Sequence, residues 1–126
     1  MSFEDNRAVA IRRRVVSAAR EVYKTLGWGW REEVYREALA EELKPLHVTC
    51  EIVSPVYYKG KALPHVSVRW DLLVSESVLV EIKATKSKLS ISAERQVVRY
   101  NSTHSFLCLA LNFPDRKGAQ IEFINI

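Results

Sequence analysis

Two apolar runs separated by a short polar turn occupy the centre of the chain. Residues 66–74 and 78–84 are rich in Val, Leu and Ile, and charged residues alternate with apolar ones. Alternation with a period of two is typical of β-strands, whose successive side chains point to opposite faces. Ser75, Glu76 and Ser77 between the runs are typical turn residues. The stretch therefore predicts an antiparallel hairpin.

Three charged residues lie within this hairpin. The apolar face of the first run is predicted to comprise Val68, Trp70, Leu72 and Val74. Asp71 falls on the opposite face, and Glu81 and Lys83 share one face of the second run. Because the turn brings Asp71 near Glu81, two carboxylates and an ammonium are expected to converge. Such a set suits a hard cation with a charged helper, which is the equipment for metal-assisted phosphodiester hydrolysis.

A simpler interpretation of the same charges remains open. On a solvated strand edge, Asp71 could pair with Lys83 and have no further role. The apolar flanks of Glu81 predict instead that these charges are buried. Buried charges are costly unless they are paired or bound to a metal.

Composition sets the remaining limits. A chain of 126 residues with 48% hydrophobic residues predicts one domain, residues 1–126, with a substantial core. The net charge of +4 and the pI of about 9.2 fit a polyanionic partner. Cys50 and Cys108 lie in apolar runs without metal-ligand spacing, so both are expected to be small, reduced core residues.

The chain shows no sign of a membrane span or a secretory leader. No apolar stretch approaches the roughly 20 residues that a spanning helix needs. The first five residues lack a signal-peptide pattern. We therefore expect an intracellular protein, in the cytoplasm or nucleus, that is not secreted and has no membrane partner.

The hydrophobic periodicity divides the chain into helices and strands. Helices are predicted over about 4–26, 30–43 and 91–102, and strands over about 47–58, 62–74, 78–84, 105–112 and 119–126. Gly27 and Pro45 are expected to close the first two helices. The order ααβββαββ predicts an α/β or α+β fold with a central mixed β-sheet flanked by helices.

Two helices carry further candidates for the same site. Glu32 lies three residues before Tyr35 and seven before Leu39, which places it on the apolar stripe of the second helix. The helix dipole favours an acid in the first turn, but it does not explain one that faces the core. In the third helix, Gln96 and Tyr100 are four residues apart and share a face. Half-buried packing is an equally good interpretation of that pair.

Basic residues follow the candidate site along the chain. Lys86 and Lys88 come just after the second strand of the hairpin, and Arg95 and Arg99 mark the third helix. A nucleic-acid backbone that passes the site would meet these four side chains. Nothing in the chain resembles a module that reads bases, so contacts are expected to be mainly to phosphates.

Several short segments also match a known pattern in their order and spacing. They are residues 29–35 (GWREEVY), 69–74 (RWDLLV), 80–84 (VEIKA), 96–100 (QVVRY) and 112–113 (NF). These segments resemble the GxxExxY family of the PD-(D/E)XK nuclease-like superfamily. The resemblance extends from about Gly29 onward and implies a restriction-endonuclease-like core. Trp70 and Glu51 depart from the residues usual in that family, which leaves the choice of substrate open.

The resemblance implies a metal-dependent nuclease mechanism. Asp71 and Glu81, with the backbone carbonyl of Ile82, would hold Mg²⁺ or Mn²⁺. Glu32 would contact the ion through a water molecule or complete its shell. Lys83 would orient the attacking water or stabilise the charge that develops on the phosphate.

Substrate and partners also follow from the resemblance. Gln96 and Tyr100 would position the nucleophile or the nucleic-acid backbone. The expected activity is hydrolysis of phosphodiester bonds in DNA, and the small size suggests a homodimer or a larger complex. The alternative is a catalytically inactive module of the same fold that binds nucleic acid or a partner protein.

Overall fold

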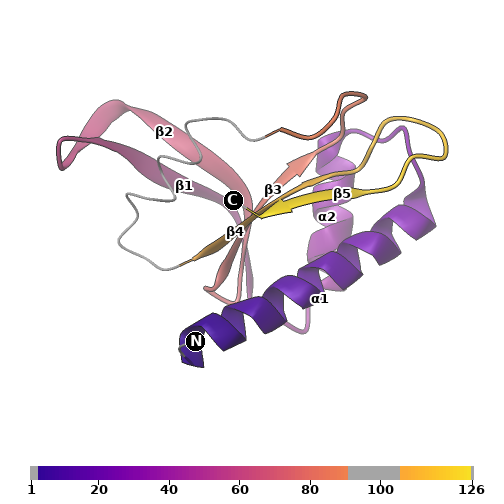
Figure 1. The fold of residues 1–126 in the computed structure, drawn as a ribbon, viewed down its shortest axis with the longest axis horizontal. Helices are drawn as coiled ribbons and strands as arrows, with labels where there is room; N and C mark the ends of the chain where they lie inside the picture. Colours follow the sequence, from indigo (N-terminus) through magenta and orange to yellow (C-terminus); the bar gives the residue numbers. More distant parts are fainter. Residues whose placement is uncertain (1–2, 91–105, 126) are drawn as a thin grey trace.

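The computed structural model describes residues 3–90 and 106–125, and it confirms an α+β fold with a mixed sheet (Figure 1). The described elements are α1 (Phe3–Leu26), α2 (Glu32–Glu42), β1 (Val48–Tyr58), β2 (Lys61–Val74), β3 (Val78–Lys83), β4 (Leu107–Asn112) and β5 (Glu122–Asn125). Each agrees with a predicted element to within a few residues. The helix predicted over 91–102 lies outside the described residues.

The strands form one sheet in the order β1-β2-β3-β4-β5. Three of the pairs are antiparallel, and β3 pairs with β4 in parallel. Parallel neighbours need a crossover connection, here the chain between β3 and β4. Both central strands are buried along most of their length, as expected of strands covered on two faces.

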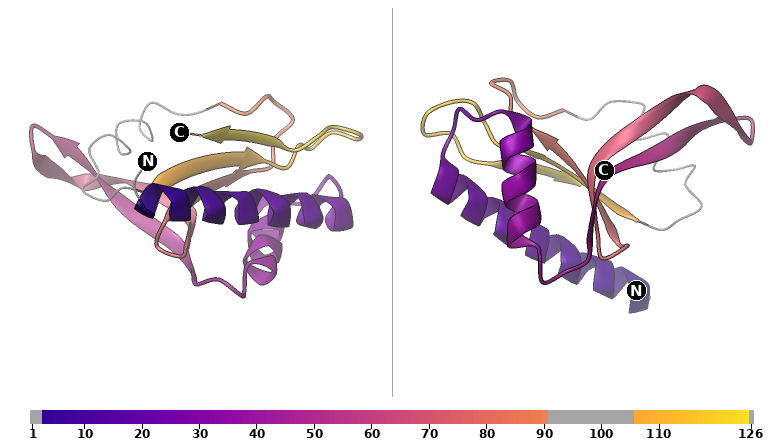
Figure 2. Two further views of the ribbon diagram at one scale, coloured as in Figure 1. Left: turned by 60° about the horizontal axis from the view of Figure 1, so that its bottom comes forward. Right: turned by 180° about the vertical axis from the view of Figure 1, so that it is seen from behind.

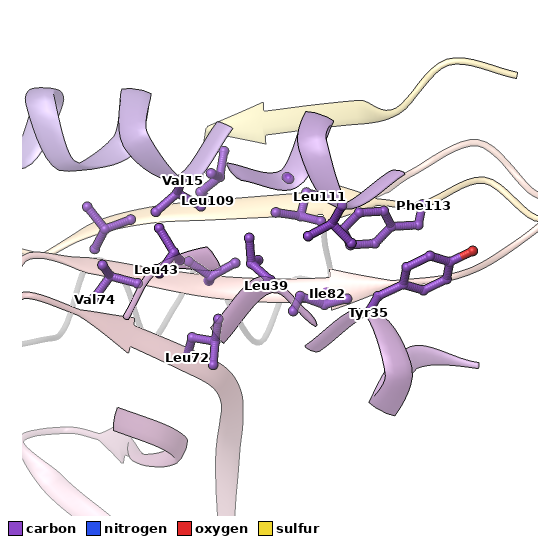
Figure 3. Packing of buried hydrophobic residues seen from close by; sticks show 14 residues of the cluster. Val15, Tyr35, Leu39, Leu43, Leu72, Val74, Ile82, Leu109, Leu111 and Phe113 are labelled. Atoms are coloured by element: carbon purple, nitrogen blue, oxygen red, sulfur yellow. The ribbon is translucent and has the colours of Figure 1, made fainter. Parts of the chain in front are cut away.

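Helices α1 and α2 lie on one face of the sheet (Figure 2). Their apolar side chains pack on β2, β3 and β4, and ten residues of this core are labelled in Figure 3: Val15, Tyr35, Leu39, Leu43, Leu72, Val74, Ile82, Leu109, Leu111 and Phe113. Full burial of one such side chain contributes about 1.5–3 kcal/mol. This packing, more than intrinsic helix propensity, fixes where the two helices lie.

One strand does not follow the expected alternation. Val68, Trp70, Leu72 and Val74 were predicted to share one face of β2, and that prediction is wrong. Leu72 belongs to the core under the helices, whereas Trp70 packs with Leu79 and Cys108 on the other side of the sheet. The pairing of β2 with β3 covers only Leu72–Val74, while β1 follows β2 along most of its length. The β1–β2 hairpin thus leaves the sheet near Asp71 and projects outward (Figure 1).

The cysteines differ from their predicted surroundings. Both are free thiols; Cys108 is buried in β4, as predicted, but Cys50 is exposed. Cys50 belongs to β1, an edge strand whose described residues are exposed or only half-buried. The apolar run around Cys50 therefore does not mark a buried strand. None of the described helices is long and apolar enough to cross a membrane.

Candidate active site

Asp71 lies where β2 separates from β3. If the register of Leu72 opposite Val80 continued, Asp71 would lie opposite Glu81 and Ile82 opposite Trp70. Instead, the Oδ2 atom of Asp71 accepts a 2.7 Å hydrogen bond from the backbone nitrogen of Ile82. The Asp71 side chain thus satisfies a backbone donor at the point where the ladder stops.

Glu81 and Lys83 lie on one face of β3, as alternate residues of a strand do. Glu81 is only 6% exposed. The Nζ atom of Lys83 is 3.6 Å from Oε1 of Glu81, and the Lys83 side chain is 41% exposed. A buried carboxylate therefore has a cation beside it whose head reaches solvent. In the parallel ladder, Ala110 lies next to Glu81, and this small side chain leaves room on that face.

An arginine that was not predicted joins this region from α2. The Nη1 atom of Arg36 is 3.4 Å from Oε1 of Glu51 and 3.9 Å from Oδ1 of Asp71. Glu51 has a positive φ of 56° in the middle of β1, so the strand paired with β2 is irregular beside Asp71. The only sequence signal for Arg36 was its spacing, four residues after Glu32 on the same helix face.

Glu32 is the first residue of α2 and is half-buried. One helical turn separates it from Arg36, so its side chain leaves the helix on the face that reaches Asp71. Among residues 3–90 and 106–125, no three His, Cys, Asp or Glu side chains gather closely enough to hold a metal together. Asp71 and Glu81 lie on neighbouring strands, and their joint binding of a metal and the role of Glu32 through water stay predictions.

This donor set fits a magnesium-like ion. Mg²⁺ keeps several of its own waters and is commonly bound through one or two carboxylates. Asp71 and Glu81 supply two carboxylates, and the backbone carbonyl of Ile82 is an oxygen of the same hard type. Oxygen donors of this kind are the ones that Mg²⁺ or Mn²⁺ accepts, and the described residues contain no cluster for a metal that demands a full set of His, Cys, Asp or Glu ligands.

A buried asparagine and a half-buried glutamate hold the segment that follows β3. Asn112 is fully buried, and its Oδ1 atom accepts a 2.9 Å hydrogen bond from the backbone nitrogen of Thr85. Its Nδ2 atom donates to Oε1 of Glu122 at 2.9 Å and lies within 3.5 Å of the carbonyls of Thr85 and Ser87. Glu122 also accepts from the backbone nitrogen of Leu89 at 3.3 Å. These bonds fix the course of residues 85–89.

The predicted phosphate contacts divide into two groups. Lys86 and Lys88 are exposed and lie on the segment held by Asn112 and Glu122. Gln96 and Tyr100, predicted to be catalytic, and the nucleic-acid contacts Arg95 and Arg99 lie outside the described residues. The sequence pointed to Asn112 only through the resemblance at residues 112–113, and it gave no signal for Glu122. The contacts of both residues join segments that are far apart in the chain.

Comparison with known proteins identifies the superfamily of this chain. The family model of the PD-(D/E)XK nuclease superfamily matches residues 9–123. No significant match was found among curated proteins or solved structures. The match covers most of α1, all of α2 and β1 to β4, the first half of β5, and both Asp71 and Glu81, and the mixed sheet agrees with a restriction-endonuclease-like core. The chain therefore belongs to the PD-(D/E)XK nuclease superfamily.

Proposed function

We propose that this protein is a metal-dependent nuclease that hydrolyses phosphodiester bonds in DNA. The observation that carries this proposal is the position of Asp71, at the β2–β3 separation and bonded to the nitrogen of Ile82, next to buried Glu81. If Asp71 served only as an ion-pair partner, the neighbouring strand would not need a second, buried carboxylate at Glu81. Membership of a nuclease superfamily supports the same activity.

The acids would hold Mg²⁺ or Mn²⁺ together with the backbone carbonyl of Ile82, and Glu32 would contribute through water. A bound ion of this kind supplies Lewis-acid polarisation of the phosphate and lowers the pKa of a water ligand. Lys83 is well placed to orient water or stabilise charge, because its ammonium is anchored by Glu81 and still reaches solvent.

The nucleic-acid part of the proposal rests on charge. The chain carries a net charge of +4, and Lys86 and Lys88 are exposed on the segment directly after β3. We propose that they contact backbone phosphates, with Arg95 and Arg99 extending that surface and with Gln96 and Tyr100 positioning the reacting groups. We also propose that the chain belongs to the GxxExxY group of the superfamily, and the resemblance of residues 29–35 to that motif supports this.

One observation favours the alternative, a catalytically inactive module. The guanidinium of Arg36 lies 3.9 Å from Asp71 and 3.4 Å from Glu51. A cation in this position compensates the charge of Asp71 without a metal. Because Arg36 is 3.9 Å from Asp71 and closer to Glu51, the pairing with Asp71 is loose, and we propose that a divalent ion can displace it. The two functions therefore differ in what happens when metal is added.

The remaining parts of the proposal concern the whole molecule. We propose that residues 1–126 are one domain that acts as a homodimer or within a larger complex. The projecting hairpin supports the second point, because it exposes the apolar side chains of Val53, Leu63 and Val66. The free thiols of Cys50 and Cys108 support an intracellular location, where thiols stay reduced.

A cleavage assay with matched variants tests the proposed function. Purified protein is incubated with Mg²⁺, Mn²⁺, Ca²⁺ or EDTA and with linear, nicked, branched and single-stranded DNA, and RNA is used for comparison. Cutting is expected with Mg²⁺ or Mn²⁺, and Ca²⁺ should support binding with little cleavage because its shell is looser. Lys83→Ala should abolish cutting and leave Mn²⁺ binding by calorimetry unchanged, whereas Lys117→Ala, in the exposed β4–β5 connection, should behave as wild type.

The outcomes separate the two functions. If wild type and Lys83→Ala are equally inert on every substrate but both bind DNA, the inactive module is the better conclusion. If wild type binds no nucleic acid at low salt, both functions fail and a protein-binding role replaces them.

A further inference from the structure

Two tryptophans are exposed in the connection between α1 and α2. Trp28 is 49% exposed and Trp30 is 48% exposed, whereas Trp70 is fully buried. Isolated apolar residues on a surface are ordinary, but two half-exposed indoles within three residues of the chain are a large apolar area to leave in water. The core under the helices does not need either ring, since neither is among its residues. Their exposure calls for a function outside the core.

The backbone around these rings is held in a defined shape. Gly27 and Gly29 have φ values of 74° and 98°, in the region that favours glycine, so Trp28 is presented between two turns of the chain. The indole nitrogen of Trp30 donates a 2.8 Å hydrogen bond to the carbonyl of Leu26. Tyr35 closes the connection, because its hydroxyl donates to the carbonyl of Gly27 at 2.7 Å. The hydrogen bonds of Trp30 and Tyr35 therefore hold the backbone of the connection that carries both indole rings.

This connection lies at the same end of the sheet as the candidate active site (Figure 1). Tyr35 stacks on Phe113 with ring centroids 4.3 Å apart, and the backbone nitrogen of Phe113 donates to the carbonyl of Lys83 at 2.9 Å. One packed pair of rings thus separates the tryptophan connection from the end of β3. The exposed Lys86 and Lys88 follow β3 at this end.

We propose that Trp28 and Trp30 form a stacking platform for the bases of a single-stranded nucleic acid. Indole rings stack on any base, and this contact tolerates any sequence. Lys86 and Lys88 would bind the phosphate backbone but not the bases. The two indole rings would bind the unpaired bases. The net charge of +4 and the exposed Lys86 and Lys88 at this end of the sheet favour a polyanionic occupant over an apolar protein surface. This inference rests on the proposed function and adds that the bound nucleic acid is single-stranded.

An abasic oligonucleotide separates stacking from phosphate binding. Oligo-dT and an abasic strand of equal length carry the same phosphates, and their affinities are measured with Ca²⁺ to prevent cleavage. Wild type is expected to bind oligo-dT at least about fivefold more tightly per stacked base, which corresponds to roughly 1 kcal/mol. Oligo-dT should also quench tryptophan fluorescence, and the abasic strand should not. Because Trp70 is fully buried, the quenched signal must come from Trp28 and Trp30.

Variants of the two tryptophans test whether these residues cause the difference in affinity between oligo-dT and the abasic strand. Trp28→Leu and Trp30→Leu together should bind oligo-dT and the abasic strand equally, with unchanged affinity for the abasic strand. Trp28→Phe should retain part of the preference for bases. Tyr58→Leu is the matched control, because Tyr58 is an exposed aromatic residue at the tip of the distant β1–β2 hairpin (Figure 1). It should bind both strands as wild type does.

Three results would overturn the inference. Equal binding of both strands by wild type would show phosphate contacts only, and the proposed function would survive. A base preference that persists in the double tryptophan variant would place the stacking elsewhere. Absence of binding to either strand at low salt would defeat the proposed function as well, and the tryptophans would then be a protein contact.

Discussion

The carboxylate of Asp71 accepts a hydrogen bond from the backbone nitrogen of Ile82, although the ladder that joins their strands ends before either residue. The bond ties the start of the projecting hairpin to the strand that carries Glu81 and Lys83. Asp71 thus has a structural contact as well as the metal-binding role proposed for it. Substitutions that keep or remove the acceptor oxygen distinguish the two roles.

Asp71→Asn is expected to abolish metal-dependent cleavage and leave the free energy of unfolding within about 1 kcal/mol of wild type. The amide oxygen can still accept from Ile82, and the partly exposed pair with Arg36 contributes little. Asp71→Ala leaves the Ile82 donor without this acceptor, which costs about 1–3 kcal/mol. Urea unfolding without metal measures both values. An Asp71→Asn protein that fails to fold would mean that the charge itself is structural.

Asn112→Ala is expected to lower the free energy of unfolding by at least about 2 kcal/mol. The change removes the acceptor for Thr85 and a donor to Glu122 in a fully buried position, and each buried group left unsatisfied costs about 1–3 kcal/mol. Glu122→Gln keeps one acceptor oxygen and should cost less. Equal stability of Asn112→Ala and wild type would show that water replaces these bonds.

The same variant should loosen the segment that carries Lys86 and Lys88. Under native conditions, trypsin should cut after these lysines faster in Asn112→Ala than in wild type, because opening of this segment then costs less free energy. Cleavage after Lys117, in the connection between β4 and β5, is the internal reference and should change little. A uniform increase at all three sites would indicate general destabilisation instead.

Replacing Lys86 and Lys88 with glutamine should weaken DNA binding and reduce its dependence on salt. Each lost phosphate contact lowers the slope of log affinity against log salt by about one unit. Lys59→Gln with Lys61→Gln removes the same charge from the tip of the distant hairpin and should leave the slope unchanged. Fluorescence anisotropy from 50 to 200 mM salt measures the slopes. Equal slopes for the two double variants would remove these lysines from the DNA contact.

Alkaline pH is expected to destabilise the protein through Tyr35. Burial raises the pKa of the Tyr35 hydroxyl above its usual value of 10.0. The folded protein therefore holds this proton more tightly than the unfolded chain does. The contribution to stability is complete below the unfolded pKa of about 10, and it is lost as pH rises through the higher folded pKa.

Urea unfolding between pH 8 and pH 11 checks this prediction. Tyr35→Phe should be less stable than wild type at pH 8 by about 1 kcal/mol, because the bond to the Gly27 carbonyl is lost. Its stability should then fall less steeply above pH 10. Tyr58→Phe changes an exposed tyrosine and should keep the wild-type slope. Parallel slopes for wild type and Tyr35→Phe would contradict the prediction.

Local pattern in the sequence predicted the elements and part of the site. Period-two alternation placed Glu81 and Lys83 on one strand face, and their contact at 3.6 Å agrees with it. Helical spacing placed Tyr35 and Leu39 in the core, where both are fully buried. These features depend on neighbours within a few residues, so the order of side chains along the chain is sufficient to predict them.

Only the tertiary structure determined the features that join distant segments. Arg36 approaches Asp71 because α2 packs beside the point where β2 leaves β3, and Asn112 holds Thr85 because β4 lies parallel to β3. The rotation of β2 at Asp71 divides Trp70 and Leu72 between two apolar clusters. Alternation along one strand cannot predict this rotation. The rotation arises where β2 stays paired with β1 but separates from β3. The sequence alone thus determined which groups could form the site, and packing decided how they meet.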